Sequence, residues 1–279
     1  MNSLNGKTVV VTGGSMGIGE AIARAFCDAG ANVAVVSRDL ERSEAARQRL
    51  GQDDRTLALA CDVRQRAQID AAVRATLDRF GRIDVWVNNA GHGMLDSVAA
   101  MDMDACRSMF ATNVFGAVEC MQAVVPVMKQ QGSGAIINIS SVAGHIAVPF
   151  MSAYSATKHA LNAISKSARL ELKDHGIQVL TVCPGYIRTD FAVNAVKGSE
   201  IRRFGERVRR GIPPERVAQA VLEGYVRGKR EIVVPASDRI KIKLYQLVPR
   251  VIERAMMQMT QPMTAEQIAA AEARRKGLR

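Results

Sequence analysis

Residues 8–19 read TVVVTGGSMGIG, and residues 20–27 continue as EAIARAFC. The stretch is a short apolar run, a glycine-rich turn and an amphipathic helical pattern, in the order that a βαβ unit requires. Gly13 permits a tight turn, Gly17 lets the backbone approach a pyrophosphate, and Gly19 lets the following helix pack closely on a sheet. The amino end of that helix attracts phosphate. A tight turn without a ligand is the alternative, but the order of elements favours a dinucleotide site that also includes Ser15, Met16 and Ile18.

Apolar runs of this kind alternate with helix-length segments along the chain. Their near-continuous apolar character is typical of parallel strands covered on both faces. We therefore predict a single-domain, Rossmann-like α/β fold: a doubly wound parallel sheet of about seven strands with helices on both faces. The predicted strands are 7–12, 32–37, 56–61, 83–88, 135–140, 177–182 and 231–234. Residues 1–235 form the predicted dinucleotide-binding and catalytic domain, and residues 236–279 form a helical extension that is not an independent domain.

Composition is typical of a cytoplasmic globular protein. Of the 279 residues 48% are apolar, and Met1–Lys7 contains no apolar run, so neither a secretory signal nor a membrane-spanning helix is predicted. The five cysteines are odd in number, stand far apart and form no C-x-x-C pair, which argues against disulfides and a zinc site. The four histidines show no metal spacing, so we expect no metal and interpret as loop or helix-surface residues His92, His145, His159 and His175.

The net charge of +11 is unevenly distributed. Residues 1–189 hold 19 basic and 17 acidic side chains, whereas residues 190–279 hold 19 and 10, so nine of the eleven excess charges lie in the last third. A basic surface suits nucleic acid, anionic lipid or an acidic substrate. Because only 4% of the residues are aromatic and no nucleic-acid-binding module is readable, we expect no nucleic-acid partner.

The end of the second predicted strand indicates which dinucleotide fits. NAD sites place an acidic residue about 20 residues after the glycine loop to bind the ribose 2′-hydroxyl, whereas a 2′-phosphate requires a cation there. The sequence has Ser37-Arg38 at this point, with Asp39 one residue later. Arg38 can pair with the 2′-phosphate, and Ser15 and Ser37 can donate hydroxyl hydrogen bonds. NADP is the predicted cofactor; Asp39 keeps NAD as the alternative, and a solvated side chain is the other interpretation of Arg38.

With these motifs the chain resembles the short-chain dehydrogenase/reductase family from about residue 7 to residue 228. The pattern T-G-x-x-x-G-x-G stands at 12–19, C-D-V at 61–63 and N-N-A-G at 88–91. The segment PGYIRT at 184–189 resembles the family's nicotinamide-flanking segment. The resemblance implies adenine contacts from Asp62 and Val63, and further cofactor contacts from Asn89, Ala90, Gly91, Pro184, Gly185, Ile187 and Thr189.

The segment YSATK at 154–158 carries the chemistry. Tyr154 and Lys158 stand four apart on one helix face, so the ammonium can lower the pKa of the phenol from about 10. An amphipathic helix that merely carries both residues is the structural alternative. In the family pattern Ser141, preferred over Ser140, holds the substrate carbonyl, and Asn113 keeps a water-mediated proton relay beside the lysine. Taken alone, Asn113 would be an ordinary helix-surface amide, and the resemblance gives Tyr154 and Lys158 cofactor contacts as well.

These residues imply an NADP(H)-dependent oxidoreductase. It would transfer hydride between the nicotinamide and a carbonyl or secondary alcohol of a fairly apolar substrate, lipid-, steroid- or ketoacyl-like, with Tyr154 as proton donor or acceptor. One alternative is a dinucleotide-sensing regulator with little catalysis. Another is a 3-oxoacyl-thioester reductase, although the glycine-rich ending that closes the tetramer of many such enzymes is absent from the sequence. The resemblance also implies a homodimer or homotetramer.

Two segments lie beyond the family motifs. Residues 190–211 form the predicted substrate lid, whose basic residues could attract an anionic substrate or could line a solvated helix: Lys197, Arg202, Arg203, Arg207, Arg209 and Arg210. The extension carries an apolar stripe of Ile240, Leu244, Leu247, Val248, Val251, Ala255 and Met259, flanked by Arg239, Lys241, Lys243, Arg250 and Arg254. We expect the stripe to pack on its own subunit or on a second copy, with Pro249 kinking the helix; peripheral contact with a membrane surface is the less favoured alternative.

Overall fold

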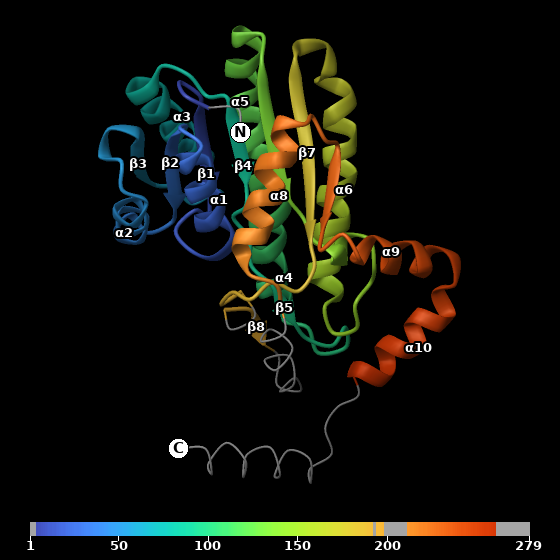
Figure 1. The fold of residues 1–279 in the computed structure, drawn as a ribbon. Helices are drawn as coiled ribbons and strands as arrows, with labels where there is room; N and C mark the ends of the chain where they lie inside the picture. Colours follow the sequence, from blue (N-terminus) through green and yellow to red (C-terminus); the bar gives the residue numbers. More distant parts are fainter. Residues whose placement is uncertain (1–3, 192–193, 198–210, 261–279) are drawn as a thin grey trace.

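A computed structural model describes residues 4–191, 194–197 and 211–260 of the chain. One sheet of seven strands, all parallel, organises it in the order β3-β2-β1-β4-β6-β7-β9 (Figure 1). The strands are β1 Thr8–Thr12, β2 Asn32–Ser37, β3 Thr56–Ala60, β4 Val85–Asn88, β6 Gly134–Ile139, β7 Ile177–Pro184 and β9 Glu231–Val234. Each lies within two residues of its predicted position, and the doubly wound fold is confirmed.

Helices cover both faces of the sheet. One face carries α1 Gly17–Asp28, α2 Leu40–Leu50 and α8 Pro214–Val226, and the other carries α3 Arg66–Phe80, α5 Gly116–Gln131 and α6 Ser152–Glu171 (Figure 1). Successive side chains of β1 alternate between the two apolar cores: Val9 and Val11 face the first set of helices, and Val10 faces the second. All three valines are fully buried, which is why the strands read as unbroken apolar runs.

Shorter elements complete the carboxyl edge of the sheet. These are α4 Met103–Phe110, a π-helical turn at Ala111–Phe115, the 3-10 turn Val142–Gly144, and a small parallel pair formed by β5 Met94–Leu95 and β8 Val196–Lys197. By length and composition the described run Met103–Gln131 could cross a membrane. Cys120, Val124 and Met128 of this run are fully buried in the second core, so we interpret it as a core helix.

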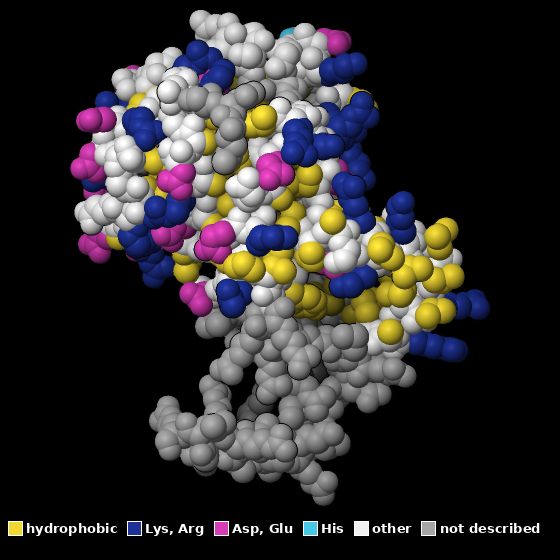
Figure 2. Space-filling view, viewed as in Figure 1, with side chains coloured by type: hydrophobic (Ala, Val, Ile, Leu, Met, Phe, Trp, Pro, Cys, Tyr) yellow, Lys and Arg dark blue, Asp and Glu magenta, His cyan; other side chains and the backbone are white. Residues whose placement is uncertain are grey.

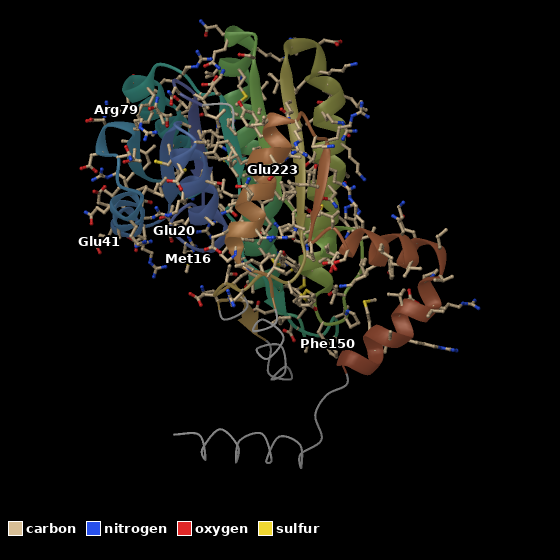
Figure 3. The ribbon with its side chains drawn as sticks, in the orientation of Figure 1. Met16, Glu20, Glu41, Arg79, Phe150 and Glu223 are labelled. Carbon is tan, nitrogen blue, oxygen red and sulfur yellow. The ribbon has the colours of Figure 1, made fainter. Side chains whose placement is uncertain are left out.

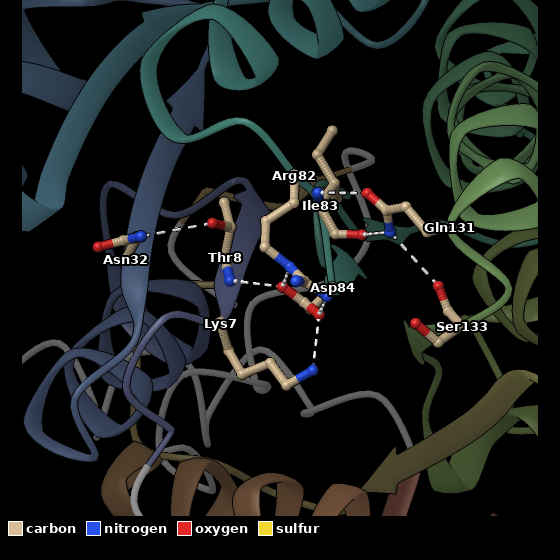
Figure 4. A network of polar contacts seen from close by, with 8 residues as sticks. All are labelled: Lys7, Thr8, Asn32, Arg82, Ile83, Asp84, Gln131 and Ser133. Carbon is tan, nitrogen blue, oxygen red and sulfur yellow. Dashed lines mark hydrogen bonds and ion pairs between the residues drawn. The ribbon is translucent and has the colours of Figure 1, made fainter.

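The amino edge of the sheet is held together by a buried carboxylate, Asp84, which is 3% exposed (Figure 4). It accepts hydrogen bonds from Lys7 Nζ at 2.9 Å, Arg82 Nη2 at 2.7 Å and the Thr8 backbone N–H at 3.0 Å. Burial works to raise the pKa of Asp84, but the hydrogen bonds from Arg82 and Lys7 outweigh it and lower that pKa. The buried charge of Asp84 is therefore paired.

The C-terminal extension differs from the prediction in two respects. Pro249 does not kink one helix but begins a second, so that α9 Asp238–Leu247 and α10 Pro249–Thr260 form an arm that projects from the body (Figure 1). Within the described residues the predicted stripe does not pack on its own subunit, since Ile240 is 63% exposed and Leu247 is 78% exposed; its packing on a second copy stays a prediction. Ile242 packs instead, against Cys183 and Val233. Ile242 is therefore on the packed side of α9, whereas Ile240 and Leu247 of the stripe face solvent.

Candidate active site

The glycine loop follows β1 at the carboxyl edge of the sheet. Gly13 and Gly17 have positive φ angles of +62° and +59°, which only glycine adopts without strain. A Cβ at Gly13 would come within 2.9 Å of Ala90 Cα, whereas a Cβ at Gly17 would meet only Thr189, at 3.4 Å. The loop is therefore closed against the body at Gly13 and accessible at Gly17. Among its other predicted members, Met16 is 42% exposed beside the start of α1 (Figure 3), Ile18 packs on the first core, and Ser15 accepts through its carbonyl from Arg49.

Thr12 and Asn89 hold this loop against the end of β4. Thr12 Oγ1 accepts from the backbone N–H of Asn89 at 3.1 Å and of Ala90 at 3.2 Å. Asn89 Nδ2 donates to the carbonyls of Thr12 and Gly13 at 3.0 and 2.9 Å. A Cβ at Gly19 would collide with the Gly13 carbonyl and the Asn89 amide, so that position requires glycine. The role of Thr12 was missed in the sequence, where a threonine at a strand end gives no signal of its own.

The predicted adenine-ribose corner lies at the ends of β2 and β3. Asp39 Oδ1 accepts from the backbone N–H of Glu41 at 3.0 Å and of Arg42 at 3.3 Å, so this carboxylate caps α2. Arg38 is exposed, and within the described part of the chain no ion pair engages its guanidinium. Asp62 is paired with Arg64 at 2.5 Å, and the hydrogen bond from Arg64 is the main cause that lowers the pKa of Asp62.

Val63 and Ser37 complete that corner. Val63 is buried where α5 begins and lies against Gly116, at which a Cβ would come within 2.8 Å of the valine side chain. The Ser37 hydroxyl donates to the Asp39 carbonyl at 2.8 Å and lies 2.9 Å from the Ser43 hydroxyl. Both residues therefore sit at the strand ends where the sequence predicts them.

Asn113 lies inside the π-helical turn and is 2% exposed, so the interpretation as a surface amide is wrong. Its Oδ1 accepts from the His92 backbone N–H at 3.0 Å, and its Nδ2 donates to the His92 carbonyl at 2.9 Å and to Thr157 Oγ1 at 3.2 Å. A Cβ at Gly91 would come within 2.9 Å of Asn113 Oδ1. The wide turn lets the amide join the segment after β4 to helix α6.

Ser141 and Ser140, which are adjacent in the sequence, point to different places. Ser141 Oγ accepts from the Ala143 backbone N–H at 3.1 Å and donates to the Pro184 carbonyl at 3.4 Å, and its hydroxyl lies close enough to the Tyr154 phenol to lower the pKa of that group. Ser140 is buried and donates to the Lys158 carbonyl at 3.3 Å. Only Ser141 thus shares a site with the tyrosine.

Tyr154 and Lys158 are both buried on the first turns of α6. Burial raises the pKa of Tyr154 to about 12, with the hydrogen bond from Ser141 acting in the opposite direction, and burial lowers the pKa of Lys158 to about 8. Lys158 Nζ donates to the Ile139 carbonyl at 2.9 Å and lies 5.7 Å from the Tyr154 ring centroid. The expectation that Lys158 lowers the pKa of Tyr154 is therefore wrong for the chain alone, because desolvation of the phenol outweighs an ammonium directed at a carbonyl.

The segment after β7 closes the other side of the site. Gly185 donates its backbone N–H to Val234 at 2.8 Å, and a Cβ there would collide with Asp238. Ile187 pairs with Ile212, and Thr189 faces Gly17, so the nicotinamide-flanking segment and the glycine loop meet. Phe191, which the sequence analysis did not single out, lies 5.6 Å from Tyr154 between ring centroids. Most of the lid, including the side chains of Lys197, Arg202, Arg203, Arg207, Arg209 and Arg210, lies outside the described residues.

Two of the histidines, His92 and His145, lie in loop segments as interpreted, but both are half-buried. His92 is half-buried beside Asn113, and burial lowers its pKa. His145 is half-buried, with Nε2 lying 3.4 Å from Cys183 Sγ and 3.6 Å from Glu231 Oε2. The three residues stand far apart in the sequence, so no spacing rule could have found them. His159 and His175 are exposed, as expected.

Comparison with known proteins gives consistent findings. The family model described as short chain dehydrogenase matches residues 7–200. The Drosophila melanogaster "Dehydrogenase/reductase SDR family protein 7-like" is 35% identical over 88% of this chain and 77% of its own length. A 3-ketoacyl-(acyl-carrier-protein) reductase from Brucella melitensis, solved with NADH, is 26% identical with a TM-score of 0.77, over 85% of this chain and 99% of its own. A Burkholderia phymatum structure in complex with NAD shares the fold at 21% identity, with a TM-score of 0.81 over 95% of this chain and 99% of its own.

Proposed function

The chain belongs to the short-chain dehydrogenase/reductase family, and from that premise we propose that it reduces a carbonyl group of a fairly apolar substrate with NADPH, or runs the reverse reaction. An NAD(P)-dependent oxidoreductase follows from the family itself. The observation that carries the finer proposal is the convergence of Ser141, Tyr154, Lys158 and Asn113 at the carboxyl edge of the sheet, beside an open glycine loop. The regulator alternative is disfavoured because all four side chains are present at this edge of the sheet.

The residues fit a nicotinamide dinucleotide. Gly17 leaves space at the amino end of α1 where backbone can approach phosphate, and Thr189 faces the same space from the opposite side. The glycine loop, Asn89–Gly91 and the segment after β7 would hold the cofactor along this edge. When bound there, the cofactor supplies or accepts the hydride, and the chain supplies orientation and a proton.

The preference for NADP rests on the corner after β2. The Asp39 carboxylate already satisfies two N–H groups at the start of α2, so it is not oriented to receive a ribose 2′-hydroxyl. Arg38 presents an exposed guanidinium that forms no ion pair with a described acidic residue. A 2′-phosphate would be a suitable partner for it. The NADH and NAD named with the two solved relatives belong to those proteins.

Tyr154 is the proposed proton donor. A pKa of about 12 keeps the phenol protonated at neutral pH, and Ser141 fixes its direction. In carbonyl reduction the phenol O–H donates to the oxygen that becomes negative, and the Ser141 hydroxyl shares that oxygen. Proton transfer from a positioned group accelerates such a step by about 10²–10⁴-fold. Lys158, whose Nζ lies 5.7 Å from the Tyr154 ring centroid, helps to return a proton to the phenolate that remains.

The surroundings of Tyr154 support an apolar substrate. The tyrosine belongs to an apolar cluster with Met94, Met109, Ala143 and Ala153. Phe191 packs on its ring and stays 39% exposed, so an apolar surface reaches the outside of the site. A 3-oxoacyl thioester is the second candidate substrate, supported by the likeness to the Brucella melitensis reductase.

A panel of ketones tests this function. The full chain is incubated with NADPH or NADH and with ketones graded from short and polar to long and apolar. We expect loss of NADPH absorbance that grows with apolar length and a matching amount of alcohol by mass spectrometry. A panel in which only 3-oxoacyl thioesters turn over would establish the second candidate, and no turnover of any carbonyl compound would refute both.

The proposal also places the arm formed by α9 and α10 on the surface of an anionic membrane, with the rest of the chain in the cytoplasm. Leu244 and Val251 are 42% and 63% exposed, and Figure 2 shows apolar side chains gathered on this arm with Lys and Arg around them. The arm carries five cations, Arg239, Lys241, Lys243, Arg250 and Arg254, against Asp238 and Glu253. Two such arms would repel each other, whereas anionic lipid would attract them. The homodimer or homotetramer stays a prediction.

Vesicle sedimentation tests this surface. The variant with Leu244→Asp and Leu247→Asp should lose binding to vesicles that contain phosphatidylserine, and salt should weaken binding of the unaltered chain. Leu170→Asp on α6 is a matched control, since Leu170 is 70% exposed outside the arm. A variant that changes oligomeric state while vesicle binding is absent throughout would identify a second copy as the partner and overturn the membrane proposal.

A further inference from the structure

Three metal-ligand side chains from separate segments converge beside the active site. His145 follows the 3-10 turn after Ser141, Cys183 lies on β7, and Glu231 begins β9. His145 Nε2 lies 3.4 Å from Cys183 Sγ and 3.6 Å from Glu231 Oε2, and all three ligand atoms lie within 4.8 Å of one another. The catalytic proposal uses none of the three.

The sheet register explains the meeting. β7 and β9 are parallel neighbours in which Thr181 pairs with Glu231, so Cys183, two residues further on, lies on the same face as Glu231. The turn after β6 returns the chain over that face and delivers His145. Ile242 of α9 packs over Cys183 and closes the site on its apolar side. Glu231 remains 32% exposed and offers a route from solvent.

The two separations from His145 Nε2 match what a tetrahedral zinc ion requires. With Zn–S of about 2.3 Å, and with Zn–N and Zn–O of about 2.0–2.2 Å, tetrahedral angles place S and N about 3.6 Å apart and N and O about 3.4 Å apart. The observed separations are 3.4 and 3.6 Å. We propose that His145, Cys183 and Glu231 bind one thiophilic divalent metal ion of the Zn²⁺ class, with water as the fourth ligand.

The imidazole has the neutral form that a metal ligand needs, whereas the thiol must lose its proton on binding. Burial lowers the pKa of His145, which keeps the imidazole neutral as a ligand must be. Burial raises the pKa of the Cys183 thiol to about 12, so the metal must displace the thiol proton to form the S–metal bond. Binding therefore releases one proton, and affinity falls as pH is lowered. If the three side chains form only a hydrogen-bonded cluster, adding the metal ion releases no proton and no pH-dependent binding is observed.

The ion would tie the two segments that position Ser141. His145 lies four residues after Ser141, and Cys183 precedes Pro184, whose carbonyl accepts from Ser141 at 3.4 Å. Bridging them joins the turn after β6 to the ends of β7 and β9. Saturating Zn²⁺ should therefore raise the Tm of the chain, by roughly 4 °C or more at 100 times Kd.

Cobalt spectroscopy on the untagged full chain tests the site. We expect Co²⁺ to give visible bands of a tetrahedral ion and a near-ultraviolet thiolate charge-transfer band, both abolished by one equivalent of Zn²⁺. Cys183→Ser should remove the charge-transfer band, and His145→Gln should weaken Co²⁺ binding at least tenfold. Cys27→Ser is the matched control, because Cys27 is also buried but belongs to no ligand cluster among the described residues.

A third variant guards against loss of folding. Glu231→Gln changes a partly exposed side chain, and it should keep the charge-transfer band while weakening binding. The proposal is overturned if the unaltered chain gives no thiolate band at any Co²⁺ concentration. It is equally overturned if Cys183→Ser binds as the unaltered chain does, or if Cys27→Ser loses the band.

Discussion

The two edges of the sheet treat buried ionisable groups in opposite ways. At the amino edge Asp84 is buried with two cations and a backbone N–H, and its partners lower its pKa. At the carboxyl edge Tyr154 and Lys158 are buried, and among the described residues neither has a charged hydrogen-bonding partner. Burial raises the pKa of Tyr154 and lowers the pKa of Lys158, so it favours the neutral form of each. A buried ionisable group whose charge is paired contributes to stability. A buried ionisable group without a charged partner, beside a binding site, is suited to catalysis. We therefore expect substitutions at the amino edge to change stability and substitutions at the carboxyl edge to change activity.

Tyr154→Phe should have the largest effect. The change removes only the phenol O–H, so turnover should fall by about 10²–10⁴-fold while NADPH affinity stays within about twofold. Steady-state rates and fluorescence titration measure the two. Tyr225→Phe is the matched control, because Tyr225 also has a pKa raised by burial but packs on Phe26 away from the site. If Tyr154→Phe and Tyr225→Phe lost turnover to the same extent, the assignment of catalysis to the carboxyl edge would be wrong.

Asp84→Asn should act on stability alone. The amide keeps the size but loses the charge that Lys7 and Arg82 share, so the free energy of unfolding should fall by about 2 kcal/mol with kcat unchanged. Because the folded pKa of Asp84 is lowered, its contribution is present above the unfolded pKa of about 3.9 and is lost as pH falls through the folded value. Denaturant unfolding of both proteins should show the difference at pH 7 and not at the lowest pH. A fall in kcat with unchanged stability would reverse the assignment of the edges.

The pH dependence of reduction sharpens the carboxyl-edge assignment. The pKa of Lys158 is lowered to about 8, so the ammonium is present below that pH and is lost as pH rises through it. We expect kcat for carbonyl reduction to be level from pH 6 to about 7.5 and to decline above about 8. A rate that stays level to pH 10 would show that the lysine charge plays no part.

Arg38→Asp should have the smallest effect, on cofactor choice. Removing the guanidinium and adding a negative charge should lower the ratio of NADPH to NADH efficiency by on the order of tenfold, with no change in Tm. Arg42→Asp is the comparison, since Arg42 is paired with Asp39. If Arg42→Asp shifts the ratio and Arg38→Asp does not, the 2′-phosphate lies against Arg42.

The local sequence pattern predicted the fold. The features that it did not predict depend on tertiary contacts. The central strands β1 and β4 are buried on both faces, so their apolar runs and the glycine turn after β1 could be read directly. The burial of Asn113 could not be read, because a π-helical turn places it and its sequence resembles an ordinary helix. The direction of the pKa shift of Tyr154 depends on desolvation, which spacing along a helix does not reveal.

The arm shows the same limit. The stripe from Ile240 to Met259 was interpreted as a packed face because it is apolar at helical spacing. In the fold Ile242 packs with Cys183 and Val233, whereas Ile240, Leu247 and Val251 of the stripe stay 63–78% exposed. Helical periodicity identifies an apolar face but not the surface on which that face packs. The trio of His145, Cys183 and Glu231 was missed for a related reason, because only the sheet register and a turn bring the three residues together.

The central claim is that the carboxyl edge transfers hydride and a proton to a carbonyl carbon and oxygen. The most direct measurement uses NADPH deuterated at C4, in each of its two stereochemical forms, with an apolar ketone that the chain reduces. The account predicts an alcohol one mass unit heavier from one form and an unlabelled alcohol from the other, at a rate that Tyr154→Phe lowers by about 10²–10⁴-fold. Alcohol without deuterium from both forms, or labelled alcohol formed by Tyr154→Phe at the unaltered rate, would contradict it.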